Sequence, residues 1–170
     1  MVTKADAARW YPVYTHPRAE KKAYEALVHK GVEVYLPLHR QLRQWSDRKK
    51  WIEAPFIKSY IFVYIREHEQ ADVLMTKGIA RFIYFSGSIA AIPDRQIEDL
   101  KLLLAVGADL EVSNLEIAPG EKVLIKAGPF KGILAELVSL KNNKKIVLRL
   151  QHLGYSITIN TSISYIELLS

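Results

Sequence analysis

The heptapeptide KAGPFKG, residues 126–132, places two glycines and a proline around a single phenylalanine. The apolar runs EKVLI and ILAELV stand on either side of it. Glycine and proline at this density are typical of a tight turn, and short apolar runs bounded by such residues are typical of strands. The segment therefore predicts two strands joined at a turn. The ring of Phe130 either faces outward toward a partner or closes one end of a small barrel.

The rest of the C-terminal third continues in the same way. From Pro119 onward the chain consists of short strand-like runs: EKVLIKA, GILAELVSL, KKIVLRLQHL, YSITIN and SYIELL. Asn142 and Asn143, in KNNK, suit a hairpin turn. This pattern predicts a small all-β barrel over residues 118–170, which is near the lower size limit for an independent core.

Residues 1–106 instead alternate between strand-like and helix-like segments. The predicted strands are WYPVY, VEVYLPL, SYIFVYI and RFIYF, and the uniformly apolar SYIFVYI is expected at the centre of a sheet. The predicted helices are THPRAEKKAYEALVHKG, EHEQADVLMTKG and PDRQIEDLKLLLAVG. A polar stretch, HRQLRQWSDRKKWIEAPF, is expected to form a protruding hairpin with Ser46 and Asp47 at its tip. The order predicts an α+β sandwich with one antiparallel sheet.

Residues 107–117, GADLEVSNLEI, contain three acidic residues, no basic residue and no clear periodicity, so we expect a linker. The net charge of +6 is divided unequally around it. Residues 1–106 hold 17 Lys and Arg against 12 Asp and Glu, whereas residues 107–170 hold 7 against 6. A surface for a polyanionic partner is therefore expected in the N-terminal part, although the charge could also serve solubility alone.

Several classes of protein are disfavoured by composition. The chain has no cysteine, which excludes disulfides and thiolate chemistry. Its five histidines are scattered and fit no metal or nucleophile spacing, so we expect no catalytic residue, no metal and no cofactor. No stretch has the length of a signal peptide or a membrane span, which predicts a cytoplasmic protein.

Two segments resemble known families. Val123 and Ile125, followed by Gly128, Phe130 and Gly132, resemble the KOW motif. WYPVYTHPRAEKKAYEAL and PFIKSYIFVYI are similar to the opening strand and helix and to the central strand of the NusG N-terminal domain. The chain is thus identified as a member of the NusG family, which implies an NGN sandwich followed by an SH3-like KOW barrel. The pattern WYPVYTHPRAEKKA…YLP resembles the specialised UpxY and RfaH type of paralogue.

This resemblance implies a monomeric transcription elongation or antitermination factor. Such a factor binds the clamp helices of the largest RNA polymerase subunit and opposes pausing or termination on specific operons. Two alternatives stay open. One is a general elongation factor whose barrel couples to the ribosome or to a termination factor. The other is an RNA-binding translation or ribosome-assembly protein that uses the KOW barrel alone.

The resemblance also implies particular contacts with polymerase. The positions that match the family's apolar patch are Tyr14, Ile57, Tyr60, Phe62 and Phe85. Among these we expect Tyr14, Ile57 and Tyr60 to be exposed anchors. Phe62 lies two residues from Tyr60 and shares its strand face, so simple core packing is the alternative for this pair.

Nucleic-acid contacts follow from the same resemblance. Arg18, Lys21, Lys22 and Lys77 match the basic residues that face upstream or non-template DNA in the family, with a solvated helix face as the alternative. The hairpin adds Arg48, Lys49 and Lys50 beside Trp45 and Trp51, a combination that suits nucleic acid. The loop of Gly128, Phe130 and Gly132 is expected to meet an RNA or protein partner.

Overall fold

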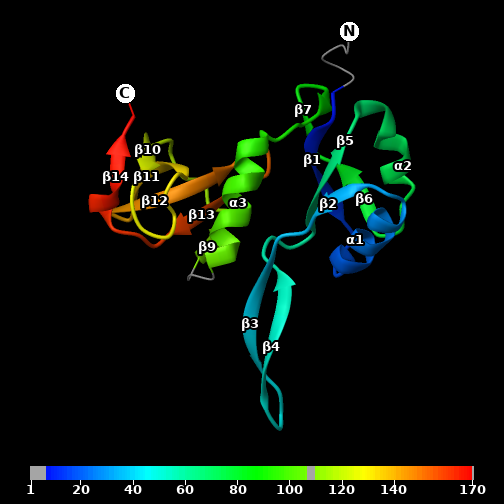
Figure 1. Cartoon of the computed structure of the whole chain (residues 1–170), viewed down its shortest axis with the longest axis horizontal. Coiled ribbons are helices and arrows are strands. Elements are labelled where there is room, and N and C mark those ends of the chain that lie inside the picture. The colour runs from blue at the N-terminus through cyan, green and yellow to red at the C-terminus, as the bar shows by residue number, and fades with distance from the viewer. Residues whose placement is uncertain (1–6, 107–109, 170) are drawn as a thin grey trace. The chain divides into compact units, whose positions relative to one another are not determined.

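The computed structural model of the chain describes residues 7–106 and 110–169. The chain divides into two compact units, Met1–Ile97 and Glu98–Ser170, and the division falls within helix α3. The elements up to that helix are β1 (Arg9–Thr15), α1 (Glu20–His29), β2 (Glu33–Tyr35), β3 (Leu38–Gln44), β4 (Lys49–Pro55), β5 (Tyr60–Ile65), η1 (Glu67–Glu69), α2 (Gln70–Leu74), β6 (Ile79–Phe82), β7 (Tyr84–Phe85), β8 (Ser88–Ile89) and α3 (Asp94–Val106) (Figure 1). The elements after it are β9 (Leu110–Ser113), β10 (Glu121–Ile125), β11 (Leu134–Leu140), β12 (Asn143–Leu150), β13 (Tyr155–Ile159), η2 (Ile163–Tyr165) and β14 (Ile166–Leu168).

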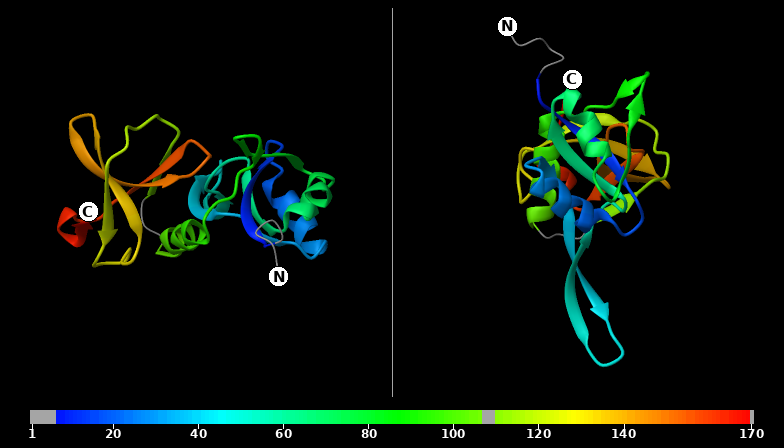
Figure 2. Two further views of the ribbon diagram at one scale, coloured as in Figure 1. Left: turned by 90° about the horizontal axis from the view of Figure 1, so that it is seen from above. Right: turned by 90° about the vertical axis from the view of Figure 1, so that its right-hand side faces the viewer.

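The first unit is built on a four-stranded antiparallel sheet of order β2-β5-β1-β6. Helices α1 and α2 lie on one face of it (Figures 1 and 2). Ala23 and Leu27 of α1 and Val73 of α2 are fully buried there. They pack with the aliphatic and aromatic side chains of that sheet face: Tyr11, Val13, Ile61, Val63, Ile65, Ile79 and Phe82. The expected central position of SYIFVYI is confirmed, because β5 pairs with both β1 and β2.

The opposite face of this sheet is aromatic. Strand pairing sets Trp10 opposite Tyr64, Pro12 opposite Phe62 and Tyr14 opposite Tyr60. Because alternate residues of a strand point to the same side, all of these side chains lie on the face away from α1 and α2. Tyr35 of β2, which is paired with Phe62, joins them. The sheet therefore separates a helix-covered face from an aromatic one.

Strands β3 and β4 form the expected hairpin and pair only with each other (Figure 1). The backbone amide of Trp45 donates to the carbonyl of Arg48 over 2.7 Å, which closes the turn around Ser46 and Asp47. The predicted tip is therefore confirmed. Residues 40–51 are all exposed, so the ribbon extends beyond the packed part of the unit.

The second unit contains a six-stranded antiparallel sheet of order β14-β10-β11-β12-β13-β9. The expected fold class, an α+β domain with an antiparallel sheet followed by an all-β domain, is confirmed. Ile117, Val138 and Val147 form a buried cluster in this unit. Left-handed backbone at Lys141 (φ 49°) and Asn142 (φ 64°) places the β11–β12 turn one residue earlier than the Asn142–Asn143 turn that we expected.

The linker prediction is wrong for part of its length. Residues 110–113 form strand β9, in which Val112 is paired with Ile157 and Leu110 with Ile159 of β13. This pairing satisfies backbone groups along one edge of β13, which a local reading of the sequence does not reveal. The expected helix end at Gly107 and the acidic Asp109 lie outside the described residues. Among the described residues, no helix is both long and apolar enough to cross a membrane.

Candidate protein and nucleic-acid interfaces

Tyr14, Tyr60 and Arg81 form one contact group, here called the tyrosine cluster. The ring centroids of Tyr14 and Tyr60 are 5.4 Å apart at an interplanar angle of 73°, an edge-to-face arrangement. The guanidinium carbon of Arg81 lies 5.2 Å from the centroid of the Tyr14 ring. Strand pairing explains the group, because Tyr14 of β1 is opposite Tyr60 of β5 on one side and Arg81 of β6 on the other. Both tyrosines are half-buried, so each remains partly accessible to solvent.

A buried carboxylate supports the start of β5. Glu20, the first residue of α1, is 7% exposed, and its Oε1 atom accepts a hydrogen bond of 3.0 Å from the backbone amide of Ser59. Ser59 has a left-handed backbone (φ 66°), and its carbonyl accepts from the amide of Thr15 over 2.8 Å. These bonds connect α1 and β1 to the residue before Tyr60. The position of the tyrosine cluster is therefore set by backbone contacts and not by its own side chains alone.

Ile57 is not an exposed anchor, and that prediction is corrected. Ile57 is 1% exposed and lies in the bend between β4 and β5. Phe56 beside it is also buried, and its amide donates to the carbonyl of Pro37 over 2.8 Å. Consecutive side chains in a bend need not point to opposite sides, as they do in a strand, so both can be buried.

Phe62 is likewise a core residue, which the alternative interpretation of the Tyr60–Phe62 pair allowed. Phe62 is 1% exposed, and its ring is stacked on Tyr35 at a centroid distance of 6.2 Å. It lies in the middle of the central strand, whereas Tyr60 lies at the strand's end. Phe62 and Tyr60 are on the same face of the strand, and their different positions along it explain why the first is buried and the second is half-buried.

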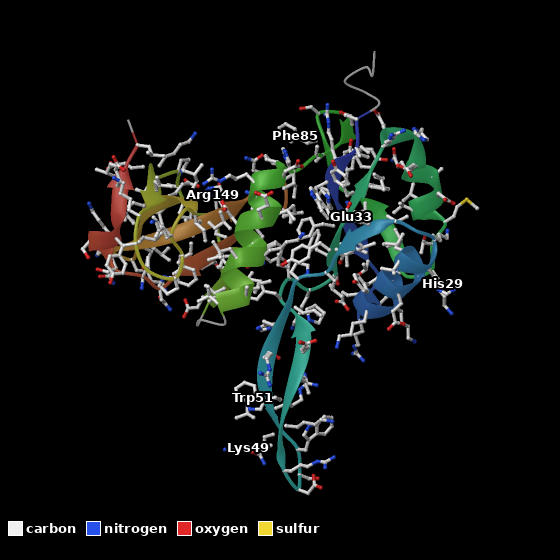
Figure 3. All side chains as sticks on the ribbon, viewed as in Figure 1. His29, Glu33, Lys49, Trp51, Phe85 and Arg149 are labelled. Atoms are coloured by element: carbon white, nitrogen blue, oxygen red, sulfur yellow. The ribbon has the colours of Figure 1, made fainter. Side chains whose placement is uncertain are left out.

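Phe85 is exposed, at 61%, but does not belong to the four-stranded sheet. The predicted strand 81–85 is interrupted at Ile83, and Tyr84 and Phe85 form a small separate hairpin with β8. Tyr84 is also exposed, at 57%, and its hydroxyl accepts a hydrogen bond from Gln70 over 3.1 Å. This hairpin therefore exposes two aromatic rings, and Tyr84 was not among the residues predicted from the sequence. Figure 3 labels Phe85 on the hairpin.

Helix α1 and Lys77 line an open groove of about 630 Å³, here called the basic groove. Its lining residues are Lys22, Glu25, Ala26, His29, Lys30 and Lys77. Two of the four basic residues predicted to contact DNA, Lys22 and Lys77, thus meet in one depression although 55 residues separate them in the sequence. Lys30 is held at the rim by Asp72, whose carboxylate is 3.8 Å from its ammonium group and whose carbonyl accepts from it over 3.1 Å.

Lys21 and Arg18 lie outside the groove lining. The ammonium group of Lys21 donates to the backbone carbonyl of Glu53 over 2.7 Å, so this side chain ties α1 to the base of the β3–β4 hairpin. Arg18 is exposed in the turn before α1 and has a left-handed backbone (φ 61°). The four predicted residues therefore separate into a groove pair, a hairpin support and an exposed turn residue.

The hairpin carries its basic residues as the sequence indicates. Arg48, Lys49 and Lys50 are all exposed near its tip, and Arg43 is paired with Lys50 across the ribbon. The guanidinium carbon of Arg40 lies 5.4 Å from the centroid of the Trp51 ring. At the other end, His39 packs edge-on against Phe56 at 5.2 Å, and burial lowers the pKa of its imidazole. The charged part of the ribbon is thus its distal part.

The turn of Gly128, Phe130 and Gly132 differs from the expectation of an outward ring. Phe130 is 2% exposed and closes the barrel, which was the alternative interpretation. The amide of Lys131 donates to the carbonyl of Gly128 over 3.2 Å, and this turn directs the ring inward. Both glycines have left-handed backbones, with φ of 80° and 97°. The driving force is the apolar area that an aromatic ring removes from water.

Glu136 and Arg149 form a two-point ion pair in the second unit. Glu136 accepts from Arg149 through both oxygens, over 2.8 and 3.3 Å, and from the amide of Gly120 over 3.1 Å. Burial by itself would raise the pKa of Glu136, but the hydrogen bonds from Arg149 and Gly120 and the charges of Arg149 and Lys122 hold it below its ordinary value. No group of three or more metal-ligating side chains occurs within residues 7–106 and 110–169.

Comparison with known proteins gives the same fold and extends it to function. A family model described as "Transcription termination factor nusG" matches residues 8–101. The transcription termination/antitermination protein NusG of Borreliella burgdorferi is 24% identical over 178 residues, which cover 93% of this chain and 97% of the relative. The protein of that name from Staphylococcus aureus is 22% identical over 181 residues, covering 98% and 99%. A solved structure of Thermotoga maritima NusG has a TM-score of 0.51 and 19% identity, covering 96% of this chain and 98% of that one.

The fold and these relatives together define a transcription termination/antitermination factor, which is not an enzyme. The chain belongs to the NusG family. The relatives named above are bacterial.

Proposed function

We propose that this factor binds the clamp helices of the largest RNA polymerase subunit through the tyrosine cluster. The observation that carries the proposal is the edge-to-face pair of Tyr14 and Tyr60 with Arg81 beside it, half-buried at the end of a rigid sheet. Aromatic and arginine side chains are the residues that most often dominate binding energy in protein interfaces. The cluster combines both types on strands whose register fixes them before binding, which limits the entropy lost on association.

The exposed rings of Tyr84 and Phe85 are a second apolar surface for this contact. Each is more than half exposed, and no stability argument requires two neighbouring aromatic side chains in solvent. Ile57 and Phe62 are excluded from the proposed surface because the folded chain buries them.

The basic groove is the proposed contact for upstream or non-template DNA. Lys22 of α1 and Lys77 of the turn between α2 and β6 line it. Lys30 and His29 line the same groove, which has one acidic residue, Glu25. Cationic groups gathered on one surface attract a polyanion through counterion release without reading its sequence. In this proposal one unit holds both polymerase and DNA. A bound factor favours the closed clamp only if its contacts with the closed state are more favourable than those with the open state.

We further propose a specialised role on particular operons in the cytoplasm, with general elongation activity as the alternative. The second unit would then recruit a ribosomal or termination partner. Its exposed surface, rather than Phe130, supplies that contact, because the ring is buried. Mapping genome occupancy separates the two roles: confinement to a few operons supports specialisation, and occupancy across transcription units supports a general factor.

The test of polymerase binding uses Tyr14→Ala and Tyr60→Ala in the full chain. Each change is expected to weaken binding to a clamp-helix fragment by about 1–3 kcal/mol, the range for an aromatic hot spot. Tyr24→Ala is the matched control, because Tyr24 is an exposed tyrosine on α1 and outside the cluster. Titration calorimetry measures the affinities, and unchanged affinity in both cluster variants contradicts the proposal.

A further inference from the structure

One face of the β3–β4 ribbon carries an exposed tryptophan, Trp51, that lies outside the buried core. The register pairs Arg40 with Glu53, Leu42 with Trp51, and Gln44 with Lys49. Since directly paired residues point to the same side, these six residues form one surface, here called the ribbon face. Trp51 is 58% exposed and Leu42 is 50% exposed. Figure 3 shows Trp51 and Lys49 on the hairpin, away from the four-stranded sheet.

The exposure of Trp51 is not explained by stability. The ribbon is two-stranded, and both of its faces are exposed from residue 40 to residue 51. A hairpin of this kind buries little apolar area, so Trp51 contributes to no core. A large aromatic side chain retained in water on a protruding element indicates a contact outside the chain.

The charge around Trp51 indicates the chemistry of that contact. Residues 40–53 contain five basic side chains and two acidic ones, Asp47 and Glu53, and Glu53 is paired with Arg40 on the ribbon face. Arg40 lies over the Trp51 ring at 5.4 Å, and Lys49 stands two residues from Trp51 on the same strand face. Alternate residues on a strand are about 6.8 Å apart. Lys49 is therefore close enough to Trp51 to contact the phosphate of a nucleotide whose base is stacked on the indole ring. A polyanion with flat, exposed bases matches this pattern.

We propose that the ribbon face binds single-stranded DNA, with an unpaired base stacked on Trp51 and the adjacent phosphates held by Arg40 and Lys49. A duplex fits less well, because its bases are stacked on one another and offer no free face to an indole ring. Arg40 orients the ring by its cation–π contact, which leaves the exposed part of the indole for the base. This inference rests on the proposed function, in which the factor lies beside the DNA strand opened during transcription.

The ribbon face is joined to the basic groove through α1. Lys21 donates to the carbonyl of Glu53, at the base of the ribbon, while the next residue, Lys22, lines the groove. The helix thus places one cationic side chain at the base of the ribbon and the next one in the groove. A strand held in the groove therefore has a basic path to the ribbon, whereas a separate protein partner would gain nothing from this continuity.

The test measures fluorescence anisotropy of a labelled oligothymidylate of about 12 nucleotides, within the size range of single-stranded sites. In the full chain, Trp51→Ala and Trp51→Leu are each expected to weaken binding about 5- to 150-fold, the range for one stacked base. Trp51→Phe is expected to lose less, because it keeps an aromatic face. Leucine retains apolar area without that face, so equal binding by Trp51→Leu and wild type overturns the inference. Tighter binding to a duplex, or to RNA of the same base sequence, also overturns it.

Leu115→Ala is the matched control, because it removes a side chain as exposed as that of Trp51, at 59%, from the second unit and outside the ribbon face, and it should leave DNA binding within about twofold. Binding of each variant to nucleic-acid-free core polymerase is measured in parallel. The Trp51 variants should bind polymerase normally. If the wild-type protein does not bind polymerase, but the Trp51→Ala variant binds DNA more weakly than the wild type does, the proposed function fails and the ribbon site stands. If polymerase binding is intact and Trp51→Ala leaves DNA affinity unchanged, only the ribbon site fails.

Discussion

Gly78 and Gly31 have similar backbone conformations but differ in how closely other atoms surround them. Both glycines have left-handed backbones, with φ of 94° and 80° respectively. A Cβ atom at Gly78 would lie 3.1 Å from the Cβ of Ala23 and 3.4 Å from that of Ala19. At Gly31 such an atom would meet nothing within 4 Å. Gly78→Ala therefore adds crowding against α1 to a backbone cost that Gly31→Ala has alone.

The expected free energies follow from these contacts. Alanine in left-handed backbone costs about 1–2 kcal/mol, and the loss of unfolded-state freedom offsets about 0.4–1 kcal/mol of this. Gly31→Ala is thus expected to destabilise the first unit by about 1 kcal/mol. At Gly78 the neighbour Ala23 is fully buried and cannot move freely, so overpacking adds about 1–3 kcal/mol. The total for Gly78→Ala is about 2–4 kcal/mol.

Urea unfolding followed by tryptophan fluorescence measures this difference. Trp10, Trp45 and Trp51 are the only tryptophans, and all three lie in the unit Met1–Ile97, so the signal reports that unit. Because Lys77 precedes Gly78, the same variant should also weaken binding at the basic groove under native conditions. Equal stability of the two glycine variants would refute the argument that packing against α1 requires glycine at position 78.

Two further predictions concern charge. Charge reversal at the basic groove, Lys22→Glu with Lys77→Glu, should weaken binding to an elongation complex and flatten its dependence on salt, because fewer counterions are released. Lys144→Glu with Lys145→Glu, on exposed positions of β12, changes the net charge equally and should leave the salt slope intact. In the second unit, the lowered pKa of Glu136 means that its ion pair stabilises the fold above the ordinary carboxyl pKa, and that this stability is lost as the pH falls through the lower folded value. The amide of Gly120 donates to this carboxylate, so its NMR shift should titrate below the ordinary glutamate pKa of about 4.3. A midpoint at or above that value contradicts the assignment, and Glu136→Gln should abolish the titration.

The sequence by itself determined the features that depend on neighbouring residues. Glycine and proline punctuation located the turn at residues 126–132, and Ser46 and Asp47 located the tip of the ribbon. The uniformly apolar β5 was correctly predicted at the centre of its sheet, because a strand with two covered faces needs apolar residues at consecutive positions. Residues 1–106 alternate between strand-like and helix-like segments, and residues 118–170 contain strand-like segments alone. This difference predicted an α+β domain followed by an all-β domain.

Only the tertiary structure decided which side chains are available for binding. Ile57, Phe62 and Phe130 have the residue types of an interface, yet all three are buried, since apolar residues serve cores and contacts equally well. Tyr14 and Arg81 meet through strand register, and Lys22 and Lys77 meet through the packing of α1 against the segment before β6. Strand β9 likewise could be recognised only from its pairing with β13 in the folded structure. Such contacts join residues far apart in the chain, and local periodicity carries no information about them.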